Sequence, residues 1–207
     1  VPQAPYFIND FRLNKKIVSA TLYITSRGVY EAHINGARVG DSFLTPGWTS
    51  YSNRIQYQAY DVKEMLTEGE NRIGVVLANG WFKNFKPNQG NRITDYGKST
   101  SFISEMIITY HDGSKESIID DQNWNYHFGA IRSSSIYNGE TIDLNLYDHS
   151  WAQPSNQNNH LKKAQIADKY RGRLDHTRNE MIKKREVLSA KELILSLIHI
   201  SEPTRRN

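Results

Sequence analysis

The chain of 207 residues has no cysteine and no run of 18 apolar residues. Without cysteine, disulfide bridges and thiolate metal sites are excluded, although this absence does not choose between cellular compartments. Without a long apolar run, neither a membrane-spanning helix nor a membrane partner is predicted. The hydrophobic content of 38% is enough for a packed core, so general disorder is not expected.

Familiar catalytic motifs are also missing. The seven histidines show no i, i+4 pair and no HExxH motif, so a metal hydrolase is unsupported. The chain contains no GxSxG, P-loop or GxGxxG motif. Carboxylates are common, but the sequence does not show which of them form an acid–base pair. These residues alone do not mark the chain as an enzyme, and no catalytic residue is assigned.

Positive charge is concentrated in the last part of the chain. The sequence pI is about 9.1, yet residues 1–160 carry 14 basic and 16 acidic side chains, against 12 and 6 in residues 161–207. A nucleic-acid surface needs cations clustered on the folded face. The slightly acidic first part therefore argues against nucleic acid as a partner.

Alternation with a period of two dominates residues 7–147, and 12 Tyr and 4 Trp add aromatic content typical of strands. Seven or more short strands at roughly 8–12-residue spacing, without helical segments between them, predict an all-β antiparallel sandwich. Asn35-Gly36 suits a two-residue hairpin turn, and Asp61 is expected to cap a short helical turn within residues 61–71. The residues predicted to point inward include Leu22, Ile24, Tyr30, Ala32, Ile34, Ile55, Tyr57, Ala59, Ile73, Val75 and Leu77, with Gln56 and Gln58 outward.

Three segments carry more aromatic and amide side chains than a strand pattern requires. They are residues 44–62 (with Trp48), 77–84 (with Trp81) and 134–143 (with Tyr137). Rings beside amides and carboxylates are typical of sugar binding, because C–H faces stack on rings while polar groups bind hydroxyls. The alternative is that these rings fill the core or cover its rim.

The strings "ATLYITSRGVYEAHINGARVG", "PGWTSYSNRIQYQAYDV", "GENRIGVVLANGWF" and "SIYNGETID" occur in this order. Together they resemble the N-terminal domain of bacterial α-L-rhamnosidases of glycoside hydrolase family seventy-eight, over roughly residues 6–148. The resemblance implies a jelly-roll, galactose-binding-like sandwich. It also implies an inverting hydrolase of terminal α-L-rhamnose, whose catalytic (α/α)6 barrel lies elsewhere. We therefore expect this chain alone to be inactive.

Some sandwiches of this kind bind L-rhamnose beside a calcium ion, so the resemblance makes a rhamnose-containing glycan the expected partner. The matching residues form a carbohydrate site of Asn79, Gly80, Trp81, Tyr137, Asn138 and Glu140. Asn79 and Asn138 stand where the family usually has acidic residues, which reduces the negative charge available to calcium. No cofactor is otherwise expected, and no metal ligand is assigned.

Residues 149–194 are polar and rich in Pro, Asn and Gln at first, which predicts a linker. The following stretch resembles the start of a next β-domain, and its weak helical spacing over residues 179–194 is interpreted as an extended segment instead. Residues 195–205, "LSLIHISEPTR", match a translated transposase-type sequencing adaptor, so we expect residues 195–207 to be an artefact. The start at Val1 without Met similarly predicts a truncated chain.

Three functions stay open at this stage. The first is an accessory and mainly architectural domain of a rhamnosidase. The second is a carbohydrate-binding module for rhamnose-bearing glycans. The third is an adhesion or protein-interaction sandwich, which the four-string match disfavours.

Overall fold

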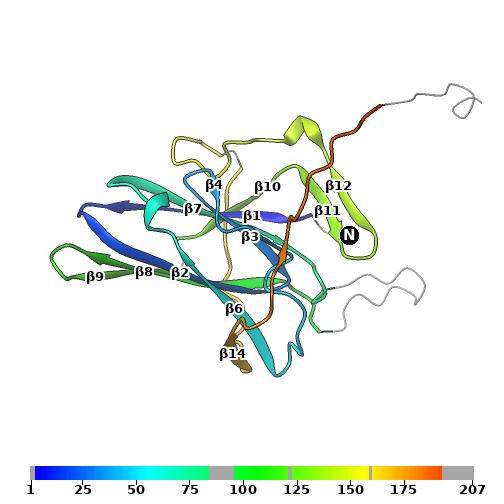
Figure 1. Cartoon of the computed structure of the whole chain (residues 1–207), viewed down its shortest axis with the longest axis horizontal. Coiled ribbons are helices and arrows are strands. Elements are labelled where there is room, and N and C mark those ends of the chain that lie inside the picture. The colour runs from blue at the N-terminus through cyan, green and yellow to red at the C-terminus, as the bar shows by residue number, and fades with distance from the viewer. Residues whose placement is uncertain (1–2, 84–95, 121–122, 159, 193–207) are drawn as a thin grey trace, which may run out of the picture.

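Two β-sheets face each other across one apolar core (Figure 1). The computed structural model describes residues 3–83, 96–120, 123–158 and 160–192. The first sheet has the order β13 (Lys162–Lys163), β10 (Asn125–Phe128), β1 (Pro5–Leu13), β7 (Gly69–Ala78), β3 (Val29–Ile34), β4 (Ala37–Arg38). The second has the order β14 (Arg173–His176), β6 (Arg54–Asp61), β2 (Ile17–Arg27), β8 (Ser101–Tyr110), β9 (Lys115–Ile119). The protein is thus an all-β sandwich, as predicted.

Two small strand pairs lie beside the main sheets. They are the hairpin of β11 (Ile131–Ser135) and β12 (Gly139–Ile142), and the pair of β5 (Ser42–Phe43) with β15 (Ile182–Lys183). Pairing is antiparallel throughout the described strands except between β14 and β6, which run parallel. The helical content described consists of two 3-10 helices, η1 (Lys63–Met65) and η2 (Leu144–Leu146). No helix in these ranges is long and apolar enough to cross a membrane.

The core follows the predicted alternation on strands β2, β3 and β7. Leu22 and Ile24 of β2 are buried opposite residues of the first sheet. The inward sets of β3 and β7 are also confirmed: Tyr30, Ala32, Ile34, Ile73, Val75 and Leu77. Every second side chain of a strand points to the same face of its sheet, so the apolar side chains of two facing sheets meet in one layer. This is why alternation of hydrophobic residues was enough to identify these strands.

Strand β6 has the opposite face inward from the one predicted. Gln58 is 5% exposed, whereas Ala59 faces solvent. Ile55 is buried as predicted, but in a separate cluster with Tyr51 and Phe82. The register pairs Gln58 with Ile24, so the glutamine shares the inward face of the sheet. Its amide is satisfied there, because Gln58 accepts a hydrogen bond from Tyr30 Oη (2.5 Å) and donates one to Thr177 Oγ1 (2.7 Å).

The predicted turn chemistry is confirmed at Asn35-Gly36. Both residues have positive φ, 50° and 85°, between β3 and β4. The helical turn expected in residues 61–71 is only η1. Asp61 Oδ1 accepts from the backbone N–H of Lys63 at 3.1 Å, and strand β7 already begins at Gly69.

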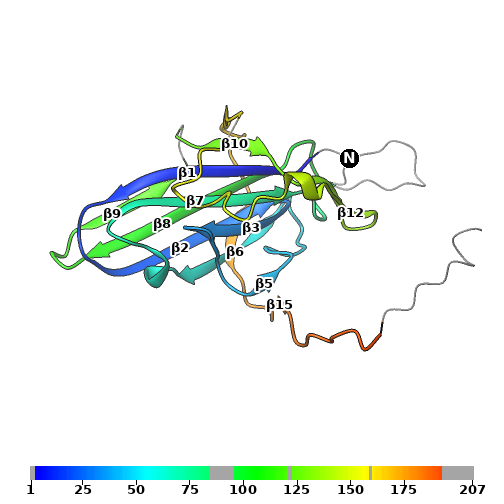
Figure 2. The same ribbon diagram turned by 90° about the horizontal axis from the view of Figure 1, so that it is seen from above.

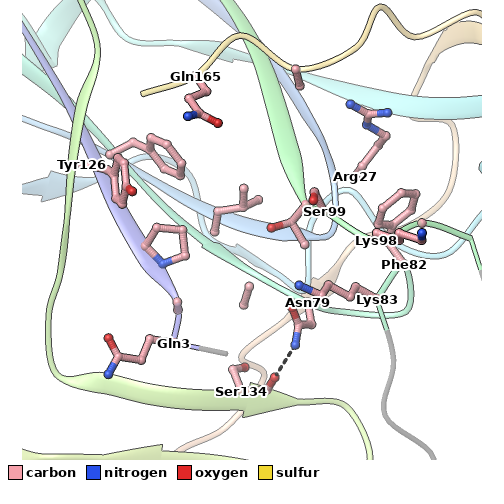
Figure 3. A pocket seen from close by; sticks show the side chains of 18 of the residues that line it. Gln3, Arg27, Asn79, Phe82, Lys83, Lys98, Ser99, Tyr126, Ser134 and Gln165 are labelled. Atoms are coloured by element: carbon pink, nitrogen blue, oxygen red, sulfur yellow. Dashed lines mark hydrogen bonds between the residues drawn. The ribbon is translucent and has the colours of Figure 1, made fainter. Parts of the chain in front are cut away.

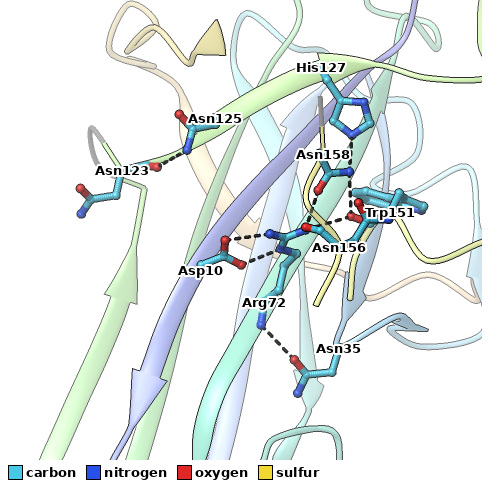
Figure 4. A network of polar contacts seen from close by, with 9 residues as sticks. All are labelled: Asp10, Asn35, Arg72, Asn123, Asn125, His127, Trp151, Asn156 and Asn158. Atoms are coloured by element: carbon cyan, nitrogen blue, oxygen red, sulfur yellow. Dashed lines mark hydrogen bonds and ion pairs between the residues drawn. The ribbon is translucent and has the colours of Figure 1, made fainter. Parts of the chain in front are cut away.

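The residues that follow the predicted end of the sandwich at residue 148 pack on its first sheet. Trp151 and Ala152 form a second buried cluster with Tyr6 and Ile8 of β1. The guanidinium of Arg72 in β7 joins the carboxylate of Asp10 to this segment (Figure 4). The boundary at residue 148 stays a prediction, but the segment just after it stabilises the first sheet.

The chain beyond residue 160 adds β13 to one sheet and β14 to the other. Between residues 179 and 192 the structure has the short strand β15 and no helix, in agreement with an extended segment. The predicted adaptor-derived stretch, residues 195–207, lies outside the described residues.

Candidate functional site

A cavity of about 680 Å³ opens at one end of the sandwich, within the size range of small-molecule sites. The hairpin β11–β12 and the N-terminal start of β1 lie at this end, whereas the β8–β9 turn lies at the other (Figures 1 and 2). Because β1 begins here while β2 and β7 end here, the antiparallel order brings Pro5, Arg27 and Ala78 to the same rim.

The segment between β13 and β14 forms part of the cavity wall. These strands belong to different sheets, so residues 164–172 must cross from one sheet to the other. Gln165, Ile166, Ala167 and Asp168 line the cavity at this crossing. In Figure 3, Gln165 and Tyr126 face the cavity from the side opposite to Asn79 and Lys83. The part of the chain predicted to be a linker and domain start therefore contributes directly to this site.

Asn79 is the predicted site residue that lines the cavity. It is buried at the end of β7, and its Nδ2 donates to the backbone oxygen of Ser134 at 3.3 Å (Figure 3). Gly80 follows with a φ of 52°, and a Cβ there would lie 2.6 Å from Cγ1 of Val29. Glycine is therefore required at this turn both by backbone conformation and by the close approach of β3.

Trp81 lies beside the cavity and does not line it. Its ring is parallel to that of Trp48, at 4° and with 6.4 Å between centroids. Trp81 also packs against the buried cluster of Tyr51, Ile55 and Phe82. The ring of Trp48 is 63% exposed, and its Nε1 donates to Tyr96 Oη at 3.2 Å. The pair thus has one anchored indole and one open to solvent.

Burial raises the pKa of Tyr51 beneath this aromatic pair. The neutral hydroxyl donates to the backbone oxygen of Gly47 at 3.1 Å. Tyr51 therefore supports the loop that carries Trp48 without carrying charge.

The other predicted residues lie on the hairpin β11–β12. Tyr137 is 58% exposed at its tip, and Asn138 and Glu140 are exposed as well. The register pairs Glu140 with Ser134, the residue whose oxygen accepts from Asn79. The structure thus brings the two predicted segments together at Ser134, but Tyr137, Asn138 and Glu140 do not line the cavity. Their role in sugar binding stays a prediction.

The predicted site residues Asn79, Asn138 and Glu140 offer few oxygen ligands for a calcium ion. Calcium in proteins takes six to eight oxygen ligands, usually with several carboxylates. Of Asn79, Asn138 and Glu140, only Glu140 carries a carboxylate. In the described ranges no three His, Cys, Asp or Glu side chains group as a metal site. These residues do not fit a resident calcium ion.

Sequence reasoning missed the cationic part of the cavity lining, which consists of Arg27, Lys83 and Lys98. Arg27 ends β2, and Lys83 follows a turn in which its backbone N–H donates to the oxygen of Asn79 at 3.2 Å. The three residues are far apart in the sequence, and each alone resembles an ordinary surface cation. No local pattern could have grouped them.

The fold and the cavity define an antiparallel β-sandwich domain with a ligand-sized site at the end of its strands. A family model for the alpha-L-rhamnosidase N-terminal domain matches residues 15–186. The chain belongs to this family, in agreement with the resemblance in its sequence.

Curated relatives with the name alpha-L-rhamnosidase are much longer than this chain. One from Formosa agariphila is 35% identical over 192 residues, covering 92% of this chain and 21% of its own length. One from Streptomyces avermitilis is 38% identical over 151 residues, covering 70% of this chain and 14% of its own. The chain therefore spans about a fifth or less of these relatives.

Solved structures show the same relationship. The rhamnosidase from Aspergillus terreus superposes with a TM-score of 0.80 at 36% identity, covering 84% of this chain and 20% of its own. The Streptomyces avermitilis rhamnosidase, solved in complex with L-rhamnose, gives 0.75 at 34% identity, covering 80% of this chain and 16% of its own. Both matches concern a minor part of a larger enzyme.

Proposed function

We propose that the chain serves as an accessory, non-catalytic domain of an α-L-rhamnosidase, which hydrolyses terminal α-L-rhamnose from glycans or glycosides with inversion. The observation that supports this most directly is the family match over residues 15–186, combined with coverage of 14–21% of the two curated relatives described above. The catalytic (α/α)6 barrel would then be a further part of the same polypeptide and the physical partner of this sandwich.

The test of this role is an activity assay on the purified chain with an aryl α-L-rhamnoside. We expect no release of the aryl group above the buffer rate. Measurable turnover by pure protein, retained through size-exclusion chromatography, would overturn the proposal, because it would place catalysis within these residues.

A second candidate role, recognition of rhamnose-bearing glycans, is supported by the cavity at Asn79. Amide and hydroxyl groups line it together with aromatic rings, which is the combination that binds sugar hydroxyls and C–H faces. Trp48 and Trp81 extend an aromatic surface beside it. A purely architectural domain does not require such groups around an open cavity.

Calorimetric titration of the chain with L-rhamnose, with and without calcium, tests this second role. We expect saturable binding that is lost in Trp81→Ala but retained in Tyr23→Ala, which removes a partly exposed ring elsewhere. Thermal unfolding of both variants checks that they are folded. The substitution Asn138→Asp restores the acidic residue usual in the family and should increase any effect of calcium. No binding of millimolar rhamnose in either condition would count against recognition of rhamnose itself.

A further inference from the structure

The cavity described above carries excess positive charge. Arg27, Lys83 and Lys98 line it, whereas Asp168 is the acidic residue in its lining. In the described part of the chain, no ion pair joins any of these three cations to a carboxylate. Some cations elsewhere on the sandwich are paired, as Lys15 is with Asp112 at 2.8 Å. This local excess of cations over carboxylates makes the cavity attractive to anions.

Arg27 is held in place by neutral acceptors. Its Nε donates to Ser101 Oγ at 2.6 Å, and its Nη2 donates to the backbone oxygen of Asp168 at 3.3 Å. These bonds orient the guanidinium without neutralising it, and three of its five N–H donors are left for a ligand. The contact with Asp168 also ties the crossing segment to the end of β2.

The rest of the lining favours a sugar over a bare inorganic anion. Side-chain amides of Gln3, Asn79 and Gln165 line the cavity, as do the rings of Phe82 and Tyr126 (Figure 3). Amides hydrogen-bond to vicinal hydroxyls, and rings bind C–H faces, whereas neither group contributes much to a small inorganic ion. The volume of about 680 Å³ is also far larger than an isolated carboxylate or sulfate needs.

We propose that this cavity binds an anionic sugar residue, whose carboxylate or sulfate group contacts Arg27, Lys83 and Lys98 while its ring contacts the amides and aromatic side chains. The inference rests on the sugar-binding role proposed above and adds that the preferred glycan is acidic. Such a glycan would present a uronic acid or a sulfated sugar next to its rhamnose.

Calorimetric titration of the chain with four probes tests the proposal: L-rhamnose, a neutral rhamnosyl-glucose disaccharide, a rhamnosyl-glucuronic acid disaccharide and a sulfated rhamnose. We expect at least one charged probe to bind roughly tenfold more tightly than its neutral counterpart, as one or two charge-assisted hydrogen bonds provide. This preference should shrink to less than about twofold at 1 M salt, where the Debye length is about 3 Å. The charged probe that binds more tightly distinguishes a carboxylate from a sulfate ligand.

The double variant Lys83→Gln/Lys98→Gln should shrink the preference for charged probes, and the further substitution Arg27→Gln should abolish it. Lys16→Gln is the matched control, because Lys16 is exposed just before β2, whose 11 residues separate it from Arg27 by about 35 Å. Equal affinity of the unmodified chain for charged and neutral probes, or a preference that survives in the triple variant, would overturn the inference while leaving sugar binding intact. If none of the four probes binds, the sugar-binding role itself fails.

Discussion

The buried side chain of Arg72, which pairs with Asp10, offers a direct test of how the segment after residue 148 is attached. Asp10 and Arg72 face each other in the β1–β7 register, and so do Arg12 and Glu70 two residues further along. The two pairs differ in environment, since the side chain of Arg72 is 5% exposed and that of Arg12 is 61% exposed. The substitutions Arg72→Met and Arg12→Met therefore remove the same group from matched positions of one sheet.

The expected cost of Arg72→Met follows from its hydrogen bonds. Arg72 Nη1 donates to the backbone oxygen of Asn156 at 3.0 Å and to Asn158 Oδ1 at 2.5 Å, and both acceptors lose this donor (Figure 4). An unsatisfied buried acceptor costs about 1–3 kcal/mol, and these two partly buried acceptors should lie at the lower end of that range. The side chain of Asp10 is 52% exposed, so water can solvate it and little is added. We expect a loss of about 2–4 kcal/mol in the free energy of unfolding, against less than about 1 kcal/mol for Arg12→Met.

Urea unfolding followed by circular dichroism measures this difference as a shift in midpoint, of about 1–2 M for Arg72→Met. Limited proteolysis should at the same time show faster cleavage within residues 148–158, because the segment loses its anchor. Equal losses of stability in the two variants, within about 0.5 kcal/mol, or unchanged cleavage of this segment would show that Arg72 does not anchor it.

Two further predictions concern the first sheet. Gly74→Ala should destabilise the fold by about 1–3 kcal/mol in thermal unfolding, because the new Cβ would lie 2.6 Å from the ring of Trp151. An additional Trp151→Leu substitution should recover part of this loss. If stability does not recover, the clash with Trp151 is refuted as the cause. The hydrogen bond from His33 holds the pKa of Glu31 at about 2, below its usual 4.5. The ionised Glu31 therefore stabilises the folded state above about pH 4.5, and this stabilisation is lost as the pH falls towards 2. Because the Glu31 side chain is 41% exposed, Glu31→Gln should lower the free energy of unfolding by less than about 1 kcal/mol at pH 6 and not at all at pH 2. A loss of stability that is the same at both pH values would count against this role of Glu31.

Much of the sandwich could be predicted because burial on one face of a strand leaves a local trace. Leu22, Ile24 and their counterparts on β3 and β7 alternate with exposed residues, so pattern and structure agree. The prediction for strand β6 was wrong because it assigned the inward face by residue polarity alone. Gln58 points inward because partners on other strands satisfy its amide, and those partners are distant in the sequence.

The candidate site was predicted only in part, for the same reason. Asn79-Gly80-Trp81 stood out as a motif, and the structure places Asn79 in the cavity with Trp81 beside it. The contribution of Gln165 could not be foreseen, because it depends on where the chain crosses between the two sheets.

The amino-acid sequence by itself determined the all-β class, the Asn35-Gly36 turn and membership of the rhamnosidase N-terminal domain family. These properties depend on residue type at short spacing, which a linear string records directly. Only the tertiary structure decided that Arg27, Lys83 and Lys98 share one cavity and that Arg72 anchors the segment after residue 148. Such groupings arise when sheet order brings distant strand ends to one rim, and local sequence carries no record of that geometry.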